Sequence, residues 1–287
     1  MSHPKFSVII PVYSELDPIQ GGASEQRHYR AEQVQRAIKS IVAQQYPDWE
    51  LILVDDGCVD GITPALLDRI AETDERIRVI HQENQNRAIA RNNGMDAAKG
   101  DWICWLDSDD EYSTHYLREL NQAIKDFPEY KIFNFGSIIH FPDHNTQIRS
   151  VYAPAIEGKG HEYFRSGHIG CGSFIFSREL WANNPEKYRI PDEVNAYQFA
   201  ATSRFDMKFT PDHVDWQFIE NPGEAFTDGV YRHGLSLGNP WGDDFLQFFL
   251  LTRDNHSKPL DVLIYIQYPR SHEGPYEHFG ATYEYDV

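Results

Sequence analysis

The chain has 287 residues, and its 44 acidic against 26 basic residues give a formal charge of −18. Nucleic acids are bound mainly through lysine and arginine contacts to phosphates, so this balance argues against a nucleic-acid partner and against a basic membrane-docking face. The three cysteines, Cys58, Cys104 and Cys171, are too few and too scattered for a disulfide framework or a zinc cluster. The N-terminal residues show no apolar signal segment, and no run approaches the roughly 20 apolar residues of a membrane span. We therefore expect a cytoplasmic protein without a transmembrane segment.

The first hundred residues alternate short apolar runs with amphipathic stretches. Apolar, β-branched runs predict four strands, at Phe6–Val12, Glu50–Val54, Ile77–Ile80 and Trp102–Leu106. Apolar residues at helical spacing predict three helices, one ending near Tyr46-Pro47, one starting at the cap Thr63 with Pro64, and one from Asn86 to Lys99 with Gly100 as its stop. Residues Leu16 to Tyr29 are polar and contain Gly21-Gly22, which predicts a long loop.

This alternation indicates βαβ units and a parallel sheet with right-handed crossovers. After Asp110 the pattern changes to a helix at about Thr114 to Phe127 and strand-like runs at Lys131–Phe141 and Gly172–Phe176. We predict an α/β fold with a Rossmann-like, mostly parallel sheet in residues 1–112 and an α+β half in residues 113–287. No Gly-x-Gly-x-x-Gly follows a strand and no Gly-Lys-Ser/Thr loop exists, so dinucleotide oxidoreductase and P-loop functions lose their main support.

The apolar run at Trp102–Leu106 ends in an acidic cluster at Asp107–Asp110. In an extended chain, residues i and i+2 share a face, so Asp107 and Asp109 are expected to point at one object beyond the strand end. A hard divalent ion such as Mg²⁺ takes one or two carboxylates and completes its shell with water and phosphate oxygens. The motif therefore indicates a metal-bound diphosphate, whereas an acidic chain also produces Asp-x-Asp by chance.

Polar clusters follow three of the predicted strands, at Tyr13–Glu15, Asp55-Asp56 and Asp107–Asp110. Open parallel sheets bind ligands outside the carboxyl ends of their strands, so these clusters are expected to meet at one edge. Turn chemistry explains each cluster singly but does not predict so many carboxylates in all three. The convergence favours a site for a nucleotide together with a metal.

Four successive blocks resemble family 2 glycosyltransferases with the GT-A fold. They are FSVIIPVY at Phe6–Tyr13, AIKSIVAQQYPDWELILVDDGCVD at Ala37–Asp60, NQNRAIARNNGMDAA at Asn84–Ala98 and WLDSDDEY at Trp105–Tyr112. The resemblance implies an inverting transferase that uses a nucleotide-diphosphate sugar and Mn²⁺ or Mg²⁺. The implied roles are Pro11, Tyr13 and Glu15 near the nucleoside, Asp56 on the base, Arg91 near the pyrophosphate, and Asp107 and Asp109 at the ribose and metal. The insertion from Leu16 to Tyr29 departs from the family pattern and leaves the role of Glu15 open.

The second half resembles the family at three short places. Gly170–Ser173 is similar to the small-residue segment that lines the acceptor site, which would assign acceptor binding to Gly172 and Ser173, although a tight turn explains it almost as well. Asp243-Asp244 resembles the acidic pair that provides the base, with Asp244 first and Asp243 as the fallback. His272 resembles a histidine that approaches the metal or diphosphate. Trp241 lies in a flexible Gly- and Pro-rich run beside the proposed base and is a candidate for closing over substrate.

The function this implies is a metal-dependent single displacement from a nucleotide-sugar donor to the hydroxyl of a sugar or glycolipid acceptor, in polysaccharide or glycoconjugate synthesis. Two alternatives stay open. A catalytically silent nucleotide-sugar binder acting as a regulatory or assembly subunit would keep the strand-end carboxylates without needing the acidic pair. A nucleotidyltransferase shares the architecture but usually has a Gly-rich basic phosphate loop after the first strand, which Tyr13–Gly22 does not offer. The sequence does not name the sugar, the nucleotide, the acceptor or the oligomeric state.

Overall fold

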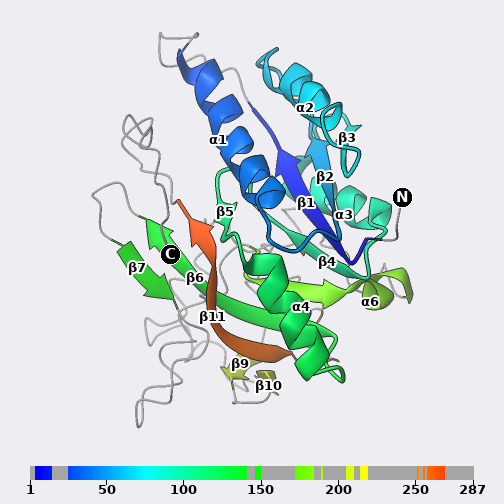
Figure 1. The fold of residues 1–287 in the computed structure, drawn as a ribbon, viewed down its shortest axis with the longest axis vertical. Helices are drawn as coiled ribbons and strands as arrows, with labels where there is room; N and C mark the ends of the chain where they lie inside the picture. The colour runs from blue at the N-terminus through cyan, green and yellow to red at the C-terminus, as the bar shows by residue number, and fades with distance from the viewer. Residues whose placement is uncertain are drawn as a thin grey trace.

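The computed structural model describes residues 4–14, 25–140, 146–149, 172–183, 189, 205–209, 214–218, 251, 255 and 257–268. Four parallel strands form its N-terminal part, in the order β3, β2, β1, β4 (Figure 1). Their bounds are β1 Phe6–Val12, β2 Trp49–Asp55, β3 Ile77–His81 and β4 Trp102–Trp105. Every residue of β1, β2 and β4 is buried, as expected for a parallel sheet covered on both faces. The predicted alternation of strands and helices is therefore confirmed.

Helices cover both faces of these strands. On one face, α1 (Glu25–Val42) and α2 (Thr63–Ala71) pack with Val8 and Ile10 of β1 in the larger apolar core, which also receives α4 (Tyr116–Asp126). On the other face, α3 (Asn86–Ala97) packs against Ile9 of β1 and Ile52 of β2. Neighbouring residues of one strand thus enter different cores, because successive side chains of a strand point to opposite faces.

The helix α1 starts earlier than the sequence predicts. We expected a loop as far as Tyr29, but the helix begins at Glu25. The first residues, Glu25-Gln26-Arg27, lack the apolar spacing on which the prediction depended, although they are good helix formers. Once the turns around Val34 and Ile38 are fixed by packing, adding residues to the helix costs little, because propagation is easier than nucleation.

Two predicted helix ends also require correction. Thr63 is not the cap of α2: it is the first helical residue, and the Asp60 carboxylate accepts hydrogen bonds from the backbone N–H groups of Ile62 and Thr63 at 3.0 and 2.8 Å. The helix α3 ends at Ala97, before the predicted Lys99. Gly100 does not stop it; a Cβ there would lie 2.6 Å from the backbone nitrogen of Ser7, so glycine is required by close packing of two segments.

The C-terminal half extends the same sheet, with its remaining strands in the order β8, β6, β11, β5 beyond β4. These elements are β5 Glu111–Tyr112, β6 Ile132–His140, β7 Thr146–Arg149, β8 Phe174–Ser177, α6 Arg178–Asn183 and β11 Lys258–Gln267. The strand β8 runs antiparallel to both β4 and β6, and β7 pairs with β6. The strands β9 (Phe205–Phe209) and β10 (Val214–Phe218) form a separate antiparallel pair. The mixed second half follows the predicted loss of regular alternation.

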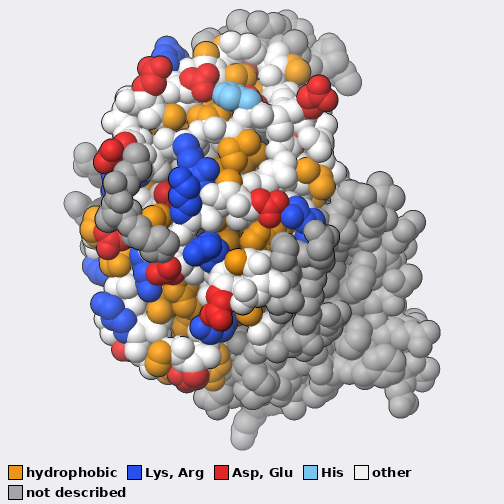
Figure 2. Space-filling model, turned by 90° about the vertical axis from the view of Figure 1, so that its right-hand side faces the viewer, with side chains coloured by type: hydrophobic (Ala, Val, Ile, Leu, Met, Phe, Trp, Pro, Cys, Tyr) orange, Lys and Arg blue, Asp and Glu red, His pale blue; other side chains and the backbone are white. Residues whose placement is uncertain are grey.

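None of the helices in the described ranges is long and apolar enough to cross a membrane. On the face shown in Figure 2, acidic and basic side chains of the described residues are interspersed with apolar ones. The large negative charge of the chain therefore does not form one acidic field on the described part of that face.

Candidate functional site

The carboxyl ends of β1, β2 and β4 lie together at one edge of the sheet. Val12 pairs with Asp55, and the Asp56 N–H donates to the Val12 carbonyl at 2.9 Å. On the other side of β1, the Leu106 N–H donates to the Ile9 carbonyl at 2.9 Å, which places the residues after β4 beside the same strand. The structure thus brings together the predicted site residues Pro11, Tyr13, Asp56, Asp107 and Asp109. Pro11 is buried in β1, and Tyr13 is 37% exposed just beyond it.

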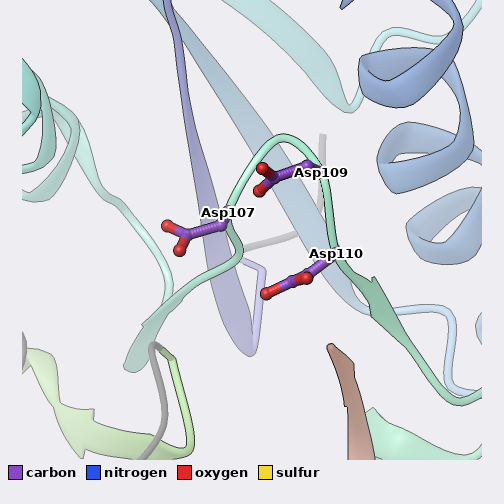
Figure 3. Close-up of side chains that lie close together, drawn as sticks. All are labelled: Asp107, Asp109 and Asp110. Carbon is purple, nitrogen blue, oxygen red and sulfur yellow. The ribbon is translucent and has the colours of Figure 1, made fainter. Parts of the chain in front are cut away.

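The chain turns directly after β4, and this turn gathers the acidic side chains. The N–H of Asp110 donates to the carbonyl of Asp107 at 3.1 Å. One carboxylate oxygen from each of Asp107, Asp109 and Asp110 lies within 4.8 Å of the others (Figure 3). We expected Asp107 and Asp109 to converge because an extended strand continues through them. They converge instead because the strand has ended and the backbone reverses.

Arginines surround the two outer carboxylates of this cluster. Arg91 of α3 is 1% exposed and lies behind Asp107, with its Nη2 2.6 Å from Oδ1. Arg30 of α1 approaches Asp109, with Nη1 3.8 Å from Oδ2. Arg36, also on α1, donates from Nη2 to the backbone carbonyl of Asp109 at 2.6 Å. The two outer carboxylates thus face guanidinium groups from α1 and α3.

Asp110 differs from its neighbours because both of its carboxylate oxygens accept hydrogen bonds, one from β11 and one from the residue that follows this strand. The Tyr265 hydroxyl donates to Oδ2 at 2.8 Å, and the Tyr268 N–H donates to Oδ1 at 2.9 Å. Burial, and next to it the charges of Asp109 and Asp107, raises the pKa of Asp110 well above its usual range. Asp110 was not among the predicted ligands, and its place directly after the Asp-x-Asp pair was the one sequence signal for it.

The donor set fits a hard divalent ion, because Asp107 and Asp109 offer half-buried carboxylate oxygens at a strand-end turn. Asp110 is less suited as a ligand, since each of its oxygens already accepts a hydrogen bond, one from the Tyr265 hydroxyl and one from the Tyr268 N–H. The third predicted ligand, His272, lies outside the described residues.

Asp56, at the end of β2, has a different environment. Its side chain is 2% exposed, and its Oδ1 accepts hydrogen bonds from the Gln82 amide at 2.7 Å and from the Gln85 N–H at 2.9 Å. Burial raises the pKa of Asp56, and these hydrogen bonds act in the opposite direction. Gln82 follows β3 and was not recognised in the sequence, where an isolated glutamine carries no signal.

The predicted acceptor residues Gly172 and Ser173 precede β8 and lie near the end of β4. Gly172 has φ of +69°, and a Cβ there would overlap the Trp105 carbonyl oxygen and lie 2.9 Å from the Tyr265 ring. Ser173 is 2% exposed, and its carbonyl accepts the Phe135 N–H at 3.1 Å. Both the left-handed backbone and the close packing therefore require glycine at 172. Glu15, Trp241, Asp243 and Asp244 lie outside the described residues.

Comparison with curated proteins finds glycosyltransferases. EpsH of Bacillus subtilis (strain 168), a proposed glycosyltransferase, is 30% identical over 197 residues, which are 69% of this chain and 53% of EpsH. Glycosyltransferase GlyG of Streptococcus pneumoniae serotype 4 is 31% identical over 121 residues, 42% of this chain and 35% of GlyG. The chain therefore spans about half the length of EpsH and about a third of that of GlyG.

Among solved structures, the fold is similar to that of S. aureus TarS residues 1–349 in complex with UDP-GlcNAc. The TM-score is 0.53 at 14% sequence identity, and the match covers 94% of this chain and 60% of that one. The expected GT-A type α/β architecture is thereby confirmed. The family model described as "Glycosyl transferase family 2" matches residues 7–183, which include all but the first residue of β1, the strands β2 to β4 and the whole acidic turn. The chain therefore belongs to glycosyl transferase family 2.

Proposed function

We propose that the protein is an inverting glycosyltransferase that moves a sugar from a nucleoside diphosphate to an acceptor hydroxyl. The observation that carries this proposal is the pair of partly exposed carboxylates, Asp107 and Asp109, at the sheet edge that also carries the buried Asp56. Family membership and the glycosyltransferase relatives support the same conclusion. Polysaccharide or glycoconjugate synthesis is the proposed setting.

Asp107 and Asp109 would hold a divalent ion, Mn²⁺ or Mg²⁺. Such an ion, when bound, stabilises the negative charge that develops on a departing diphosphate. Arg91 and Arg30 contribute fixed positive charge beside these carboxylates. Asp107 is also proposed to contact the ribose. Asp56 would accept an N–H from the base, with Pro11 and Tyr13 beside the nucleoside. These residues bind and orient the donor so that one face of its anomeric carbon stays open to the acceptor.

The acceptor side of the proposal rests on the second half of the chain. Gly172 and Ser173 lie close to the end of β4 and are proposed to border the acceptor. Asp244, with Asp243 as the fallback, is proposed as the general base that takes the proton of the attacking hydroxyl, a step usually worth about two to four orders of magnitude. Trp241 is proposed to close over the substrate and His272 to approach the diphosphate. These last four roles rest on the sequence.

An assay of nucleoside diphosphate release from a panel of sugar nucleotides tests the proposal. We expect release with one or a few donors, dependence on Mn²⁺ or Mg²⁺, loss of release in excess chelator, and a product of inverted anomeric configuration. Tight, metal-dependent binding without turnover would instead support the silent regulatory subunit, and release of pyrophosphate from a nucleoside triphosphate would support a nucleotidyltransferase.

The base is tested separately by Asp244→Asn and Asp243→Asn. Asparagine is nearly isosteric and caps helices as well as aspartate does, so a purely structural role predicts near-normal turnover in both variants. We expect Asp244→Asn to keep its donor affinity and melting temperature while turnover falls by about two to four orders of magnitude. Normal turnover in both variants would remove the acidic pair from the reaction.

A further inference from the structure

We propose that Gln82 is a positioning residue that sets the choice of nucleobase through its hydrogen bond to Asp56. The inference rests on the proposed function, in which Asp56 meets the base. It is carried by a chain of side-chain hydrogen bonds that runs from Asn93 of α3 through Gln82 to Asp56. In this chain the Asn93 Nδ2 donates to Gln82 Oε1 at 2.7 Å, and the Gln82 Nε2 donates to Asp56 Oδ1 at 2.7 Å.

The two bonds of Gln82 determine which way its amide faces. A carboxylate only accepts hydrogen bonds, so the nitrogen end of the amide must face Asp56. The oxygen end then faces α3, where the Asn93 amide donates to it. The backbone of Gln82 is held as well, since its N–H donates to the Asp55 carbonyl at 2.9 Å. Gln82 therefore presents a fixed donor to Asp56 from the neighbouring strand end.

The Gln82 amide determines which oxygen of Asp56 stays able to accept a hydrogen bond from a bound base. Oδ1 accepts from both the Gln82 amide and the Gln85 N–H, which occupies the two lone pairs of that oxygen. The Asn86 backbone N–H also hydrogen-bonds to this carboxylate, and an N–H of a bound base must then be accepted at Oδ2. Because the carboxylate is buried, its ionised form needs such donors to persist. Gln82 thus holds Asp56 both in orientation and in the state that accepts.

An ionised acceptor at this place separates bases into two classes. Uracil, thymine and guanine carry a ring N–H on the hydrogen-bonding edge and would be favoured. Cytosine and adenine present a ring nitrogen lone pair at the equivalent position and would be disfavoured, because two acceptors face each other. The ratio of UDP to CDP affinity therefore reports directly on the state and orientation of Asp56, and the two ligands share their ribose and diphosphate.

A merely structural Gln82, one that only ties β3 to α3, gives a different result. Its loss would weaken UDP and CDP binding by the same factor, because the diphosphate and ribose contacts would move together. Loss of a hydrogen bond that positions Asp56 should instead weaken UDP binding selectively. The UDP-to-CDP ratio distinguishes the two roles even if Gln82→Met lowers overall stability.

The experiment is calorimetric titration of the full chain with UDP and CDP in the presence of Mn²⁺, for the wild type, Asp56→Ala, Gln82→Met and Asn93→Asp. We expect the UDP-to-CDP ratio to fall about tenfold or more in Asp56→Ala and Gln82→Met. Asn93→Asp places a carboxylate oxygen opposite Gln82 Oε1, where two acceptors cannot form a hydrogen bond. The Gln82 amide then loses one of its two partners, and we expect an intermediate fall in the UDP-to-CDP affinity ratio. This third variant keeps the test decisive if Gln82→Met does not fold.

Gln122→Met is the matched control. Gln122 makes the same kind of bond, with its Nε2 2.8 Å from the Asp126 carboxylate, but on the exposed surface of α4. Its UDP-to-CDP ratio should equal that of the wild type. An unchanged ratio in Gln82→Met and Asn93→Asp, with a reduced ratio in Asp56→Ala, would overturn the role of Gln82 alone. An unchanged ratio in Asp56→Ala would show that Asp56 does not select the base. If neither UDP nor CDP binds the wild type, the same titrations are made with GDP and ADP, and absence of binding of all four would overturn the proposed function itself.

Discussion

The strands β2 and β4, which lie on either side of β1, are both followed by closely spaced aspartates, yet the two ends have different chemistry. At the end of β2, Asp55 and Asp56 are 4% and 2% exposed and are held by hydrogen bonds from nearby backbone and side chains. At the end of β4, Asp107 and Asp109 are half-buried and lie among arginines. The first end suits a neutral N–H donor, and the second suits a cation.

The difference comes from the backbone after each strand. After β2, the chain runs beside the end of β1, where the N–H groups of Asp56 and Val59 donate to the carbonyls of Val12 and Ser14. The Gln85 N–H and the Gln82 amide, from the segment after β3, converge on Asp56. After β4, the chain reverses at once, and this reversal brings three carboxylates together. Like charges gathered in this way are unfavourable unless opposite charge is supplied by side chains or an ion. An acidic strand end therefore does not by itself identify a metal site.

The largest expected effect is at Asp109, where the comparison predicts dependence on a cation. Replacing Asp109 with Asn removes the charge while keeping the size, and we expect kcat/KM to fall by about a thousandfold, since metal stabilisation of a leaving group is worth several kcal/mol. The measurement is steady-state release of nucleoside diphosphate across a Mn²⁺ titration. Asp101→Asn, at the opposite end of β4, is the control and should behave as the wild type. Wild-type activity in Asp109→Asn, or wild-type protein whose activity is unchanged by a chelator, would contradict the assignment of a cation site to this strand end.

The next effect is on stability at Asp110, which shares the β4 turn but resembles Asp56 in its burial. Asp110→Ala leaves the Tyr265 hydroxyl and the Tyr268 N–H without their acceptor. Each buried unsatisfied donor costs about 1–3 kcal/mol, so we expect the free energy of unfolding to fall by about 3 kcal/mol. Urea denaturation measures it, and Asp126→Ala on the exposed side of α4 should change stability little. A fall in the free energy of unfolding no larger than in Asp126→Ala would show that the hydrogen bonds from Tyr265 and Tyr268 to Asp110 contribute little to stability.

The smallest effect concerns the other carboxylate of the β2 end. His81 lies between Asp55 and Asp68, with Nδ1 2.7 Å from Asp55 and Nε2 3.0 Å from Asp68. Hydrogen bonds to Asp55 first, and then to Asp68, raise the pKa of His81 above its ordinary value of 6.5. The stabilisation from the charged imidazole is therefore complete below pH 6.5 and is lost as the pH rises through the higher folded-state pKa.

Because the His81 side chain is 47% exposed, this contribution should be well below that of a buried pair, at about 0.5 kcal/mol or less. We expect the melting temperature of the wild type to decline slightly relative to His81→Gln between pH 6 and pH 9. Parallel curves for the two proteins over that range would contradict the assignment of charge to His81.

The sequence was sufficient for the strands of the first half and for the acidic residues that follow them. Continuous apolar runs such as Phe6–Val12 specify strands buried on both faces, and this information is local. Alternation with helices then requires parallel strands, whose carboxyl ends share one edge. The placement of Asp56, Asp107 and Asp109 at that edge follows from connectivity alone.

Only the tertiary structure decided which partner each of these carboxylates has. The acceptor of the Tyr265 hydroxyl, Asp110, is 155 residues away in sequence, and the donor to Asp56, Gln82, is 26 residues away on another strand end. Such pairs depend on strand register, on the reversal after β4 and on how α3 packs against the sheet. A polar side chain of ordinary type carries no local signal of its distant partner, because a hydrogen bond depends on ångström-scale positions that only packing determines.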